Sequence, residues 1–241
     1  MKAQRWMVAA LVSVGVLALA FPLAAGEWKP TKPITVIVPW PAGGATDLTV
    51  RILASEMEKV LGQRISVVNT PGASGAIGML NAYDAPKDGY TWTGNADVSI
   101  VNYPVLDLMK ITHRDWVHWY ALMTPNIIST TADYPAKDVA DLVKIMKEKP
   151  GQVAVASAGV GSSGHLALEV FKSATGTTPR HVPYAGGNPA VIATISGESN
   201  VVMHLSMEEA DMIRAKKLKP LATSNRTLTI SGYGEVPPIT K

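Results

Sequence analysis

The chain has 241 residues, no cysteine, and 22 Lys and Arg residues against 19 Asp and Glu residues. Without cysteine it forms no disulfides and carries no lipid anchor on a processed N-terminal Cys. Two of the basic residues, Lys2 and Arg5, lie in the expected signal peptide described next. Without them the rest of the chain is almost neutral. This charge balance argues against a nucleic-acid partner.

Residues 1–26 have the pattern of a secretory signal peptide. Lys2 and Arg5 precede an apolar run from Met7 to Phe21, which is too short to span a bilayer comfortably. Small residues then suit cleavage after Ala25 or Gly26. We therefore expect export to the periplasm, with an uncleaved anchor as the alternative.

From Pro33 onward, short β-rich runs alternate with helical patterns, which predicts an α/β fold of mainly parallel sheets flanked by helices. Strands are expected at 34–38, 64–69 and 89–95. The first helix is expected to begin at Thr46 as its N-cap and to end at Gly62. The aromatic-rich run at 115–123 predicts a long strand that crosses between two lobes.

The second half repeats this alternation, with a helix at 137–148 and further strands and helices up to Ser224. We expect residues 27–123 to form lobe 1 and residues 124–221 to form lobe 2. Residues 222–241 are expected to return to lobe 1, which they leave incomplete.

Three glycine-rich loops each follow a strand and precede a helix, at 41–46, 71–78 and 158–165. Ligands of open α/β sheets bind at such loops. Glycine lets the backbone approach a ligand closely, and the helix start presents free N–H groups and a positive dipole end. The loops therefore suit an anion, although each one is also compatible with an ordinary tight turn.

Other functions are less well supported. Residues 159–164 read G-x-G-x-x-G, but no acidic residue follows about 20 positions later to hold a ribose. A secreted hydrolase that uses Ser163 and His165 is the enzyme alternative, although the chain has no G-x-S-x-G elbow. The five histidines lack metal-ligand spacing. We expect no catalytic residue, no cofactor and no metal.

Six stretches resemble the substrate-binding proteins of tripartite tricarboxylate transporters, also called Bug proteins. They run KPITVIVPWPAGGATDLTVRILA, VVNTPGASGAIG, PKDGYTW, KPGQVAVASAGVGSSGHLALEVF, HVPYAGGNPAV and KKLKPLATSNRT. The resemblance covers nearly all of residues 32–238. It implies a two-lobed periplasmic-binding-protein (Venus flytrap) fold that captures a small organic carboxylate: a di- or tricarboxylate, an aromatic acid or an acidic amino acid.

The resemblance also implies a monomer that delivers its ligand to the membrane permease subunits of a tripartite tricarboxylate-type transporter. A sensor that reports the same ligand to a signalling partner remains an alternative. The motif match assigns ligand contacts in lobe 1 to Pro41, Gly43, Gly44, Ala45, Thr46, Ala73 and Ser74. It assigns contacts in lobe 2 to Ser157, Gly159, Ser162, Ser163, His165, Pro183, Tyr184 and Gly186.

The sequence departs from the family pattern at two places. Asn200 stands where the family commonly has an Asp, and we include it among the expected ligand-binding residues. The chain also ends soon after the stretch VPPI, before the family's last helices of lobe 1.

Overall fold

The structure is a computed structural model that describes residues 28–239. Of these, residues 28–31 belong to one unit and residues 32–239 to a second one. The described residues of the first unit, 28–31, contain no helix or strand, and the expected signal peptide lies outside the described residues. Within 28–239, no helix combines the length and the apolar character that crossing a membrane would require.

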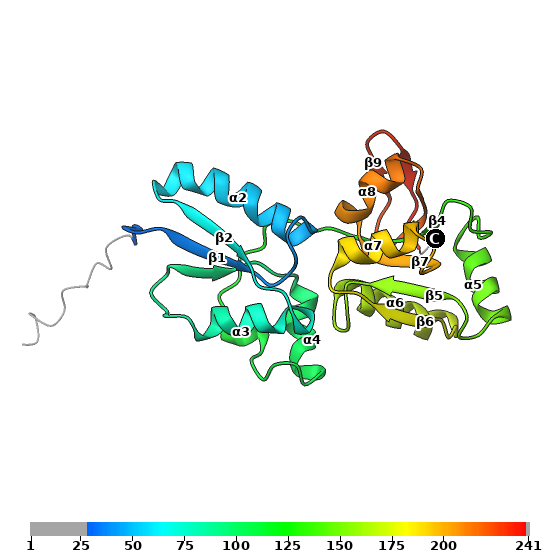
Figure 1. Ribbon diagram of the computed structural model, residues 1–241, viewed down its shortest axis with the longest axis horizontal. Helices are drawn as coiled ribbons and strands as arrows, with labels where there is room; N and C mark the ends of the chain where they lie inside the picture. Colours follow the sequence, from blue (N-terminus) through cyan, green and yellow to red (C-terminus); the bar gives the residue numbers. More distant parts are fainter. Residues whose placement is uncertain (1–27, 240–241) are drawn as a thin grey trace, which may run out of the picture. The chain divides into compact units, whose positions relative to one another are not determined.

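The second unit begins with a three-stranded parallel sheet in the order β2-β1-β3 (Figure 1). Its strands are β1 (Ile34–Val38), β2 (Ile65–Asn69) and β3 (Thr91–Thr93). The associated helices are α2 (Ala45–Leu61), η1 (Ala73–Gly75), α3 (Ala76–Asp84) and α4 (Asp97–Val105). The sheet and these helices are called lobe 1 below.

Helices cover both faces of the lobe 1 sheet. Ala54 of α2 packs with Ile34 and Val36 of β1 on one face. On the other face α3 contacts β1 and β3, and Met79 and Tyr103 lie in a cluster formed by α3 and α4. Figure 1 shows α2 and the α3–α4 pair on opposite sides of the strands.

The bounds of α2 refine the sequence-based expectation. Gly44, in an extended conformation, is the N-cap and the helix begins at Ala45, so Thr46 is a helical residue and not the cap. The helix ends as predicted at Gly62, whose φ of 65° is left-handed. Residues 44–46 therefore lie at the start of the helix, with Gly44 as its N-cap and Ala45 and Thr46 as its first two residues.

The second sheet has five strands in the order β6-β5-β7-β4-β8. They are β4 (Asn126–Thr131), β5 (Ala154–Ser157), β6 (Arg180–Pro183), β7 (Val201–Leu205) and β8 (Leu218–Thr223). Only β4 runs against its neighbours β7 and β8, whereas β5, β6 and β7 are parallel. The prediction of mainly parallel sheets is therefore confirmed, with one antiparallel strand. We call this sheet with its helices lobe 2.

Alternate residues of these strands point to opposite faces, and each face has its own core. The helices of lobe 2 are α5 (Val139–Glu148), α6 (Ser163–Thr175), α7 (Gly187–Ile195) and α8 (Ser206–Arg214). Ile128 faces a core with α5 and α6, whereas its neighbour Ile127 faces a core with α7 and α8. Lobe 2 therefore has three layers, with the sheet in the middle.

The segment between the lobes differs from the expected strand. It contains a short turn, η2 (His113–Asp115), and residues 117–125 have no regular structure. Trp119 and Tyr120 are about four-fifths exposed, at 80% and 81%. Their β propensity has no effect here because no neighbouring strand pairs with the segment.

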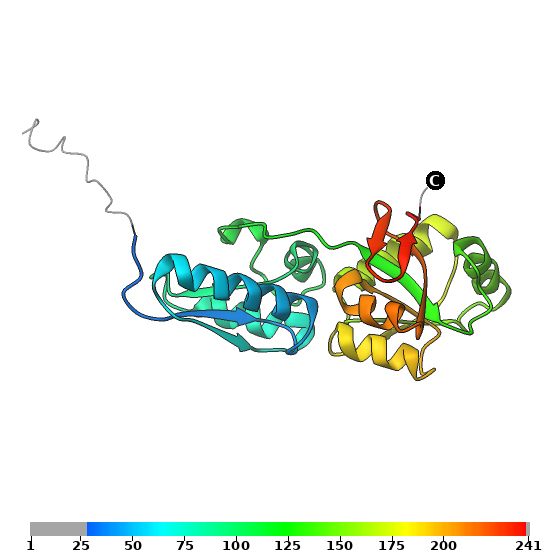
Figure 2. The same cartoon turned by 90° about the horizontal axis from the view of Figure 1, so that it is seen from above.

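Residues 228–239 pack on lobe 2, so the described part of the segment 222–241 does not return to lobe 1 as expected. Strands β9 (Leu228–Ile230) and β10 (Gly234–Val236) form an antiparallel hairpin, and Ile230 and Val236 join the core that contains α8. Figure 2 shows this hairpin near α8. The physical reason is that its two buried apolar side chains extend the core beside β8. In addition, Thr223 N–H at the end of β8 donates a hydrogen bond to Pro237 O, just after the hairpin.

Candidate ligand-binding site

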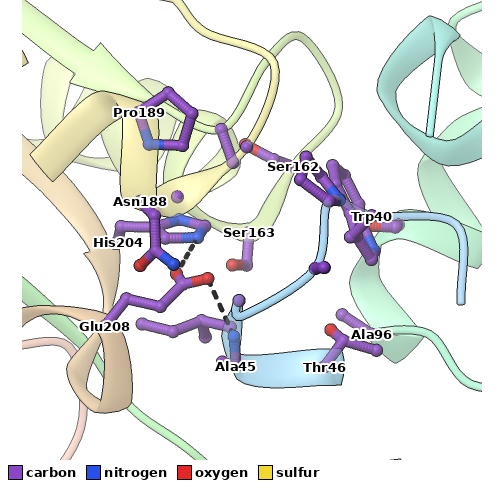
Figure 3. A pocket seen from close by; sticks show the side chains of 18 of the residues that line it. Trp40, Ala45, Thr46, Ala96, Ser162, Ser163, Asn188, Pro189, His204 and Glu208 are labelled. Carbon is purple, nitrogen blue, oxygen red and sulfur yellow. Dashed lines mark hydrogen bonds and ion pairs between the residues drawn. The ribbon is translucent and has the colours of Figure 1, made fainter. Parts of the chain in front are cut away.

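A pocket of about 260 Å³ lies where loops of lobe 1 and lobe 2 meet (Figure 3). It is at the carboxyl ends of β1, β5 and β7, as expected for a ligand site of an open α/β sheet. Its volume is below the roughly 300–1,000 Å³ of pockets for drug-sized molecules, so it suits a smaller ligand.

Five helices begin at this pocket. Their N-caps all line it: Gly44 for α2, Ala96 for α4, Ser162 for α6, Gly186 for α7 and Leu205 for α8. A helix start carries free N–H groups and about half a positive charge. No Lys or Arg is among the lining residues. The helix starts therefore favour an anion in the pocket without help from Lys or Arg.

The loop of lobe 1 that forms one wall is held by Asp47. This carboxylate is 2% exposed and accepts hydrogen bonds from Gly43 N (2.8 Å), Arg51 Nε (3.0 Å) and Asn69 Nδ2 (2.8 Å). Burial acts to raise the pKa of Asp47, but these donors outweigh it and hold the pKa below its usual value. Gly43, with a φ of +79°, makes the turn that precedes the helix.

Two stacked histidines support the loop of lobe 2 between β5 and α6. The rings of His165 and His181 lie 4.4 Å apart, and His181 Nε2 lies 2.7 Å from the hydroxyl of the fully buried Ser157. Burial, together with the neighbouring His165, lowers the pKa of His181 to about 4. Ser162 caps α6 by accepting a bond from His165 N at 3.2 Å. The histidines thus support the loop in an uncharged state.

The two lobes touch through polar contacts at the pocket. Asn188 Nδ2 donates to Gly43 O at 2.9 Å, and Ala45 N donates to Glu208 Oε1 at 2.9 Å. Glu208 also forms an ion pair with His204. Figure 3 shows the contacts of Glu208 with Ala45 and with His204. These bonds come from residues far apart in the sequence, so they depend on the fold of both lobes.

The glycines of the G-x-G-x-x-G stretch have a structural purpose. A Cβ on Gly159 would lie 2.8 Å from Ser74 Oγ, and one on Gly161 would lie 2.8 Å from Leu106 Cδ1. The close approach that these glycines permit is therefore to side chains of lobe 1. This arrangement does not resemble a loop that is open for a pyrophosphate.

The enzyme alternative also lacks its geometry. Ser163 Oγ donates to Asn126 Oδ1 at 3.3 Å and not to His165. His165 Nδ1 accepts from Gly161 N at 3.1 Å. Because the expected nucleophile and base do not contact each other, neither is activated as in a Ser/His hydrolase.

The structure brings seven of the expected ligand-binding residues to the pocket wall. These are Pro41, Gly44, Ala45, Thr46, Ser162, Ser163 and Gly186. Eight others are outside the lining: Gly43, Ala73, Ser74, Ser157, Gly159, His165, Pro183 and Tyr184. Gly43, Ser157 and His165 hold the lining loops in place, as described above. Ligand contact by any of these residues stays a prediction.

Asn200 lies at the wrong end of its strand for this pocket. It precedes β7, whereas His204 and Leu205 at the other end of β7 line the pocket. Its side chain accepts a hydrogen bond from Ala154 N at 2.9 Å, and it borders a separate hollow on the surface. Since the two ends of a five-residue strand are well separated, Asn200 lies outside this pocket, and ligand contact by it stays a prediction that the structure does not favour.

Sequence reasoning missed several lining residues, among them Trp40, Ser99, Asn188, His204 and Glu208. Trp40 and Asn188 are within or next to glycine-rich loops, so extending each loop by a residue or two would have found them. His204 follows the rule that strand ends carry functional groups. Glu208 has no local signal, because its place depends on a contact with α2.

Comparison with known proteins identifies the family. Residues 49–237 match the sequence model described as "Tripartite tricarboxylate transporter family receptor". The chain belongs to this family. Protein BugT from Bordetella pertussis is 30% identical over 222 residues, which are 88% of this chain and 66% of that protein. The expected resemblance to Bug proteins is thereby confirmed.

Solved structures agree on the fold. A TctC solute-binding protein from Polaromonas is 33% identical, with a TM-score of 0.61, and the match covers 87% of this chain and 72% of that one. MatC from Rhodopseudomonas palustris, with bound malate, is 22% identical, with a TM-score of 0.77. The match covers 88% of this chain and 80% of that one. At this lower identity MatC informs the fold alone, and the two-lobed fold of the receptor is confirmed.

The receptor spans about three fifths of the length of the curated relatives it matches, between 59% and 66% for the first three. The family is described as a transporter receptor and the Polaromonas protein as a solute-binding protein, so the expectation of a binding protein in place of an enzyme is confirmed at the level of the family.

Proposed function

We propose that this receptor captures a small organic carboxylate in the pocket between its lobes and delivers it to the membrane permease subunits of a tripartite tricarboxylate-type transporter. The observation that carries the proposal is the convergence of five helix starts on one small pocket whose lining contains no Lys or Arg. Such starts favour anions, and carboxylates are anions of the right size. The family description supports the same ligand class.

In this proposal the lobes are residues 27–123 and 124–221, extended by the tail that packs on lobe 2. Capture proceeds by closure: the ligand enters an open cleft, and the helix starts of both lobes bind it together. Bonds such as that from Asn188 to Gly43 O would stabilise the closed state. The signal peptide at residues 1–26 would direct the receptor to the periplasm, where it would act as a monomer.

Calorimetric titration with a panel of monocarboxylates, dicarboxylates, tricarboxylates, aromatic acids and amino acids tests the proposal. Micromolar or tighter binding of at least one acid is expected. Gly44→Asp should abolish it, because the new carboxylate would lie at the start of α2, where a Cβ is already 3.0 Å from Glu208 Oε1. Gly151→Asp, in open space at a left-handed glycine far along the chain, is the matched control and should bind normally.

Binding of neutral sugars or nucleotides alone would contradict the proposal. So would unchanged carboxylate binding in Gly44→Asp, since the pocket beside the start of α2 would then not be the binding site.

A further inference from the structure

The carboxylate of Glu208 already occupies the start of α2. Its Oε1 accepts the bond from Ala45 N at 2.9 Å, and its Oε2 lies 2.5 Å from His204 Nε2. The side chain is only 6% exposed and comes from α8 in lobe 2. The first amide of α2, which a ligand anion would be expected to use, is therefore bound to the chain's own anion (Figure 3).

The surrounding backbone leaves room for this carboxylate. A Cβ on Gly187 would lie 2.0 Å from Glu208 Oε2 and 2.2 Å from His204 Cδ2. Neither Gly187 nor Gly44 has a φ that requires glycine, so the absence of a side chain serves space and not backbone conformation. The pocket is thus built around Glu208.

Glu208 is ionised in this position. Burial acts to raise its pKa, but His204 and the Ala45 amide outweigh burial and lower the pKa below the usual value. The adjacent Glu209 differs: it is fully buried, bonds Ser129 and has a pKa raised well above the usual value by burial. The pocket therefore has a buried carboxylate at the end that faces α2, and its partners there, Ala45 N and His204 Nε2, belong to the chain itself.

The opposite wall carries no such charge. Here the starts of α6 and α7 meet, and Ser162, Ser163 and Gly186 line the surface. On the lobe 1 side, Ser99 is 1% exposed and also lines the pocket.

We propose that Glu208 determines the charge class of the ligand: the pocket takes a molecule with a single carboxylate, held at the starts of α6 and α7, whose other end is neutral or bears an ammonium group. A second carboxylate at that end would meet the Glu208 carboxylate and would find Ala45 N and His204 Nε2 already bound to it. An ammonium group would form a charge-assisted hydrogen bond with it. Di- and tricarboxylates are therefore rejected. The inference rests on the proposed capture of carboxylates and narrows it.

Calorimetry with ligands of matched length separates these classes. The set is butyrate, γ-aminobutyrate and succinate, followed by pentanoate, 5-aminopentanoate and glutarate. The wild-type receptor should bind each dicarboxylate at least about tenfold more weakly than the better of its two length-matched partners. In Glu208→Gln the ratio should fall to within about threefold, because the amide oxygen still accepts from Ala45 N while the charge is gone.

Two variants control the experiment. Glu208→Asp keeps the charge and should keep most of the discrimination, and it provides a second reading if Glu208→Gln does not fold. Glu56→Gln removes the same charge from an exposed site on α2, at 65% side-chain exposure, and should leave the ratio unchanged.

The outcomes distinguish the inference from the function on which it rests. If wild-type receptor binds the dicarboxylates as tightly as their partners, and Glu208→Gln leaves the ratio unchanged, the inference is overturned while carboxylate capture stands. If neither the wild type nor any variant binds any carboxylate, capture itself fails and the inference with it.

Discussion

The two lobes supply similar loops to the pocket but rest on cores of very different size. Among the described residues, the two clusters of lobe 2 contain eleven and nine buried residues, whereas those of lobe 1 contain five and four. On α2 of lobe 1, Ile52 and Val60 are exposed at 63% and 86%. Since buried apolar area is the main source of stability, we expect lobe 2 to be the more stable half.

The largest expected effect is a loss of stability that differs between the cores of the two lobes. Met79→Ala in lobe 1 and Leu168→Ala in lobe 2 each remove a fully buried side chain, at 0% exposure, and should cost about 2–5 kcal/mol. Native-state hydrogen exchange followed by mass spectrometry should show faster exchange in β1–β3 than in β5 and β7 of the wild type. Met79→Ala should accelerate only the first group.

Uniform acceleration across both sheets in each variant would break the comparison, because it would mean that the lobes unfold as one cooperative unit.

A second prediction concerns glycines at the base of each half of the pocket. A Cβ on Gly78 would lie 2.6 Å from Thr70 O, and one on Gly164 would lie 2.0 Å from Met203 O. Because both obstacles are backbone atoms, Gly78→Ala and Gly164→Ala should each destabilise the receptor by about 1–3 kcal/mol, with Gly164→Ala the more damaging. Urea denaturation provides the measurement.

Gly151→Ala is the matched control, since that glycine has open space and a φ of +72°. It should lose only the cost of a left-handed alanine, about 1 kcal/mol. A loss at Gly164 no greater than the loss at Gly151 would argue against the crowding.

The smallest predicted effect is a pH dependence in lobe 1. The folded-state pKa of Asp47 is lowered, so its contribution is present above about pH 4, the usual value for Asp, and is lost as the pH falls through the folded-state pKa. Asp47→Asn should cost about 1–2 kcal/mol at pH 7. The urea midpoints of wild type and variant should converge between about pH 4 and pH 2. A gap that stays constant with pH would assign the loss to packing.

Local sequence patterns predicted much of the fold because their cause is local. The apolar run of β1 and the left-handed stop at Gly62 follow from residues that are neighbours in the chain. The pocket loops followed from the rule for strand ends and from the resemblance. The strand expected at 115–123 is wrong, because propensity cannot supply a pairing partner and residues 117–125 have no regular structure.

Glu208 was the largest omission, and its role could not be read from the sequence. Its bond to Ala45 joins residues 163 positions apart, and it requires that the end of β7 and the start of α2 meet. Asn200 illustrates the reverse case. A motif position suggested a ligand contact, but the residue precedes β7 and so lies at the end of that strand away from the pocket. Which end of a strand a residue occupies decides its use.

The five helix starts at the pocket have a consequence for how tightly a ligand is held. A lysine or arginine would have to give up side-chain freedom, worth up to about 2 kcal/mol, each time it ordered around a ligand. Peptide dipoles are fixed when the chain folds and need no reorganisation when the ligand arrives. These donors are therefore preorganised: the entropy of arranging them is spent during folding, and in the proposed capture closure has mainly to bring the two lobes together.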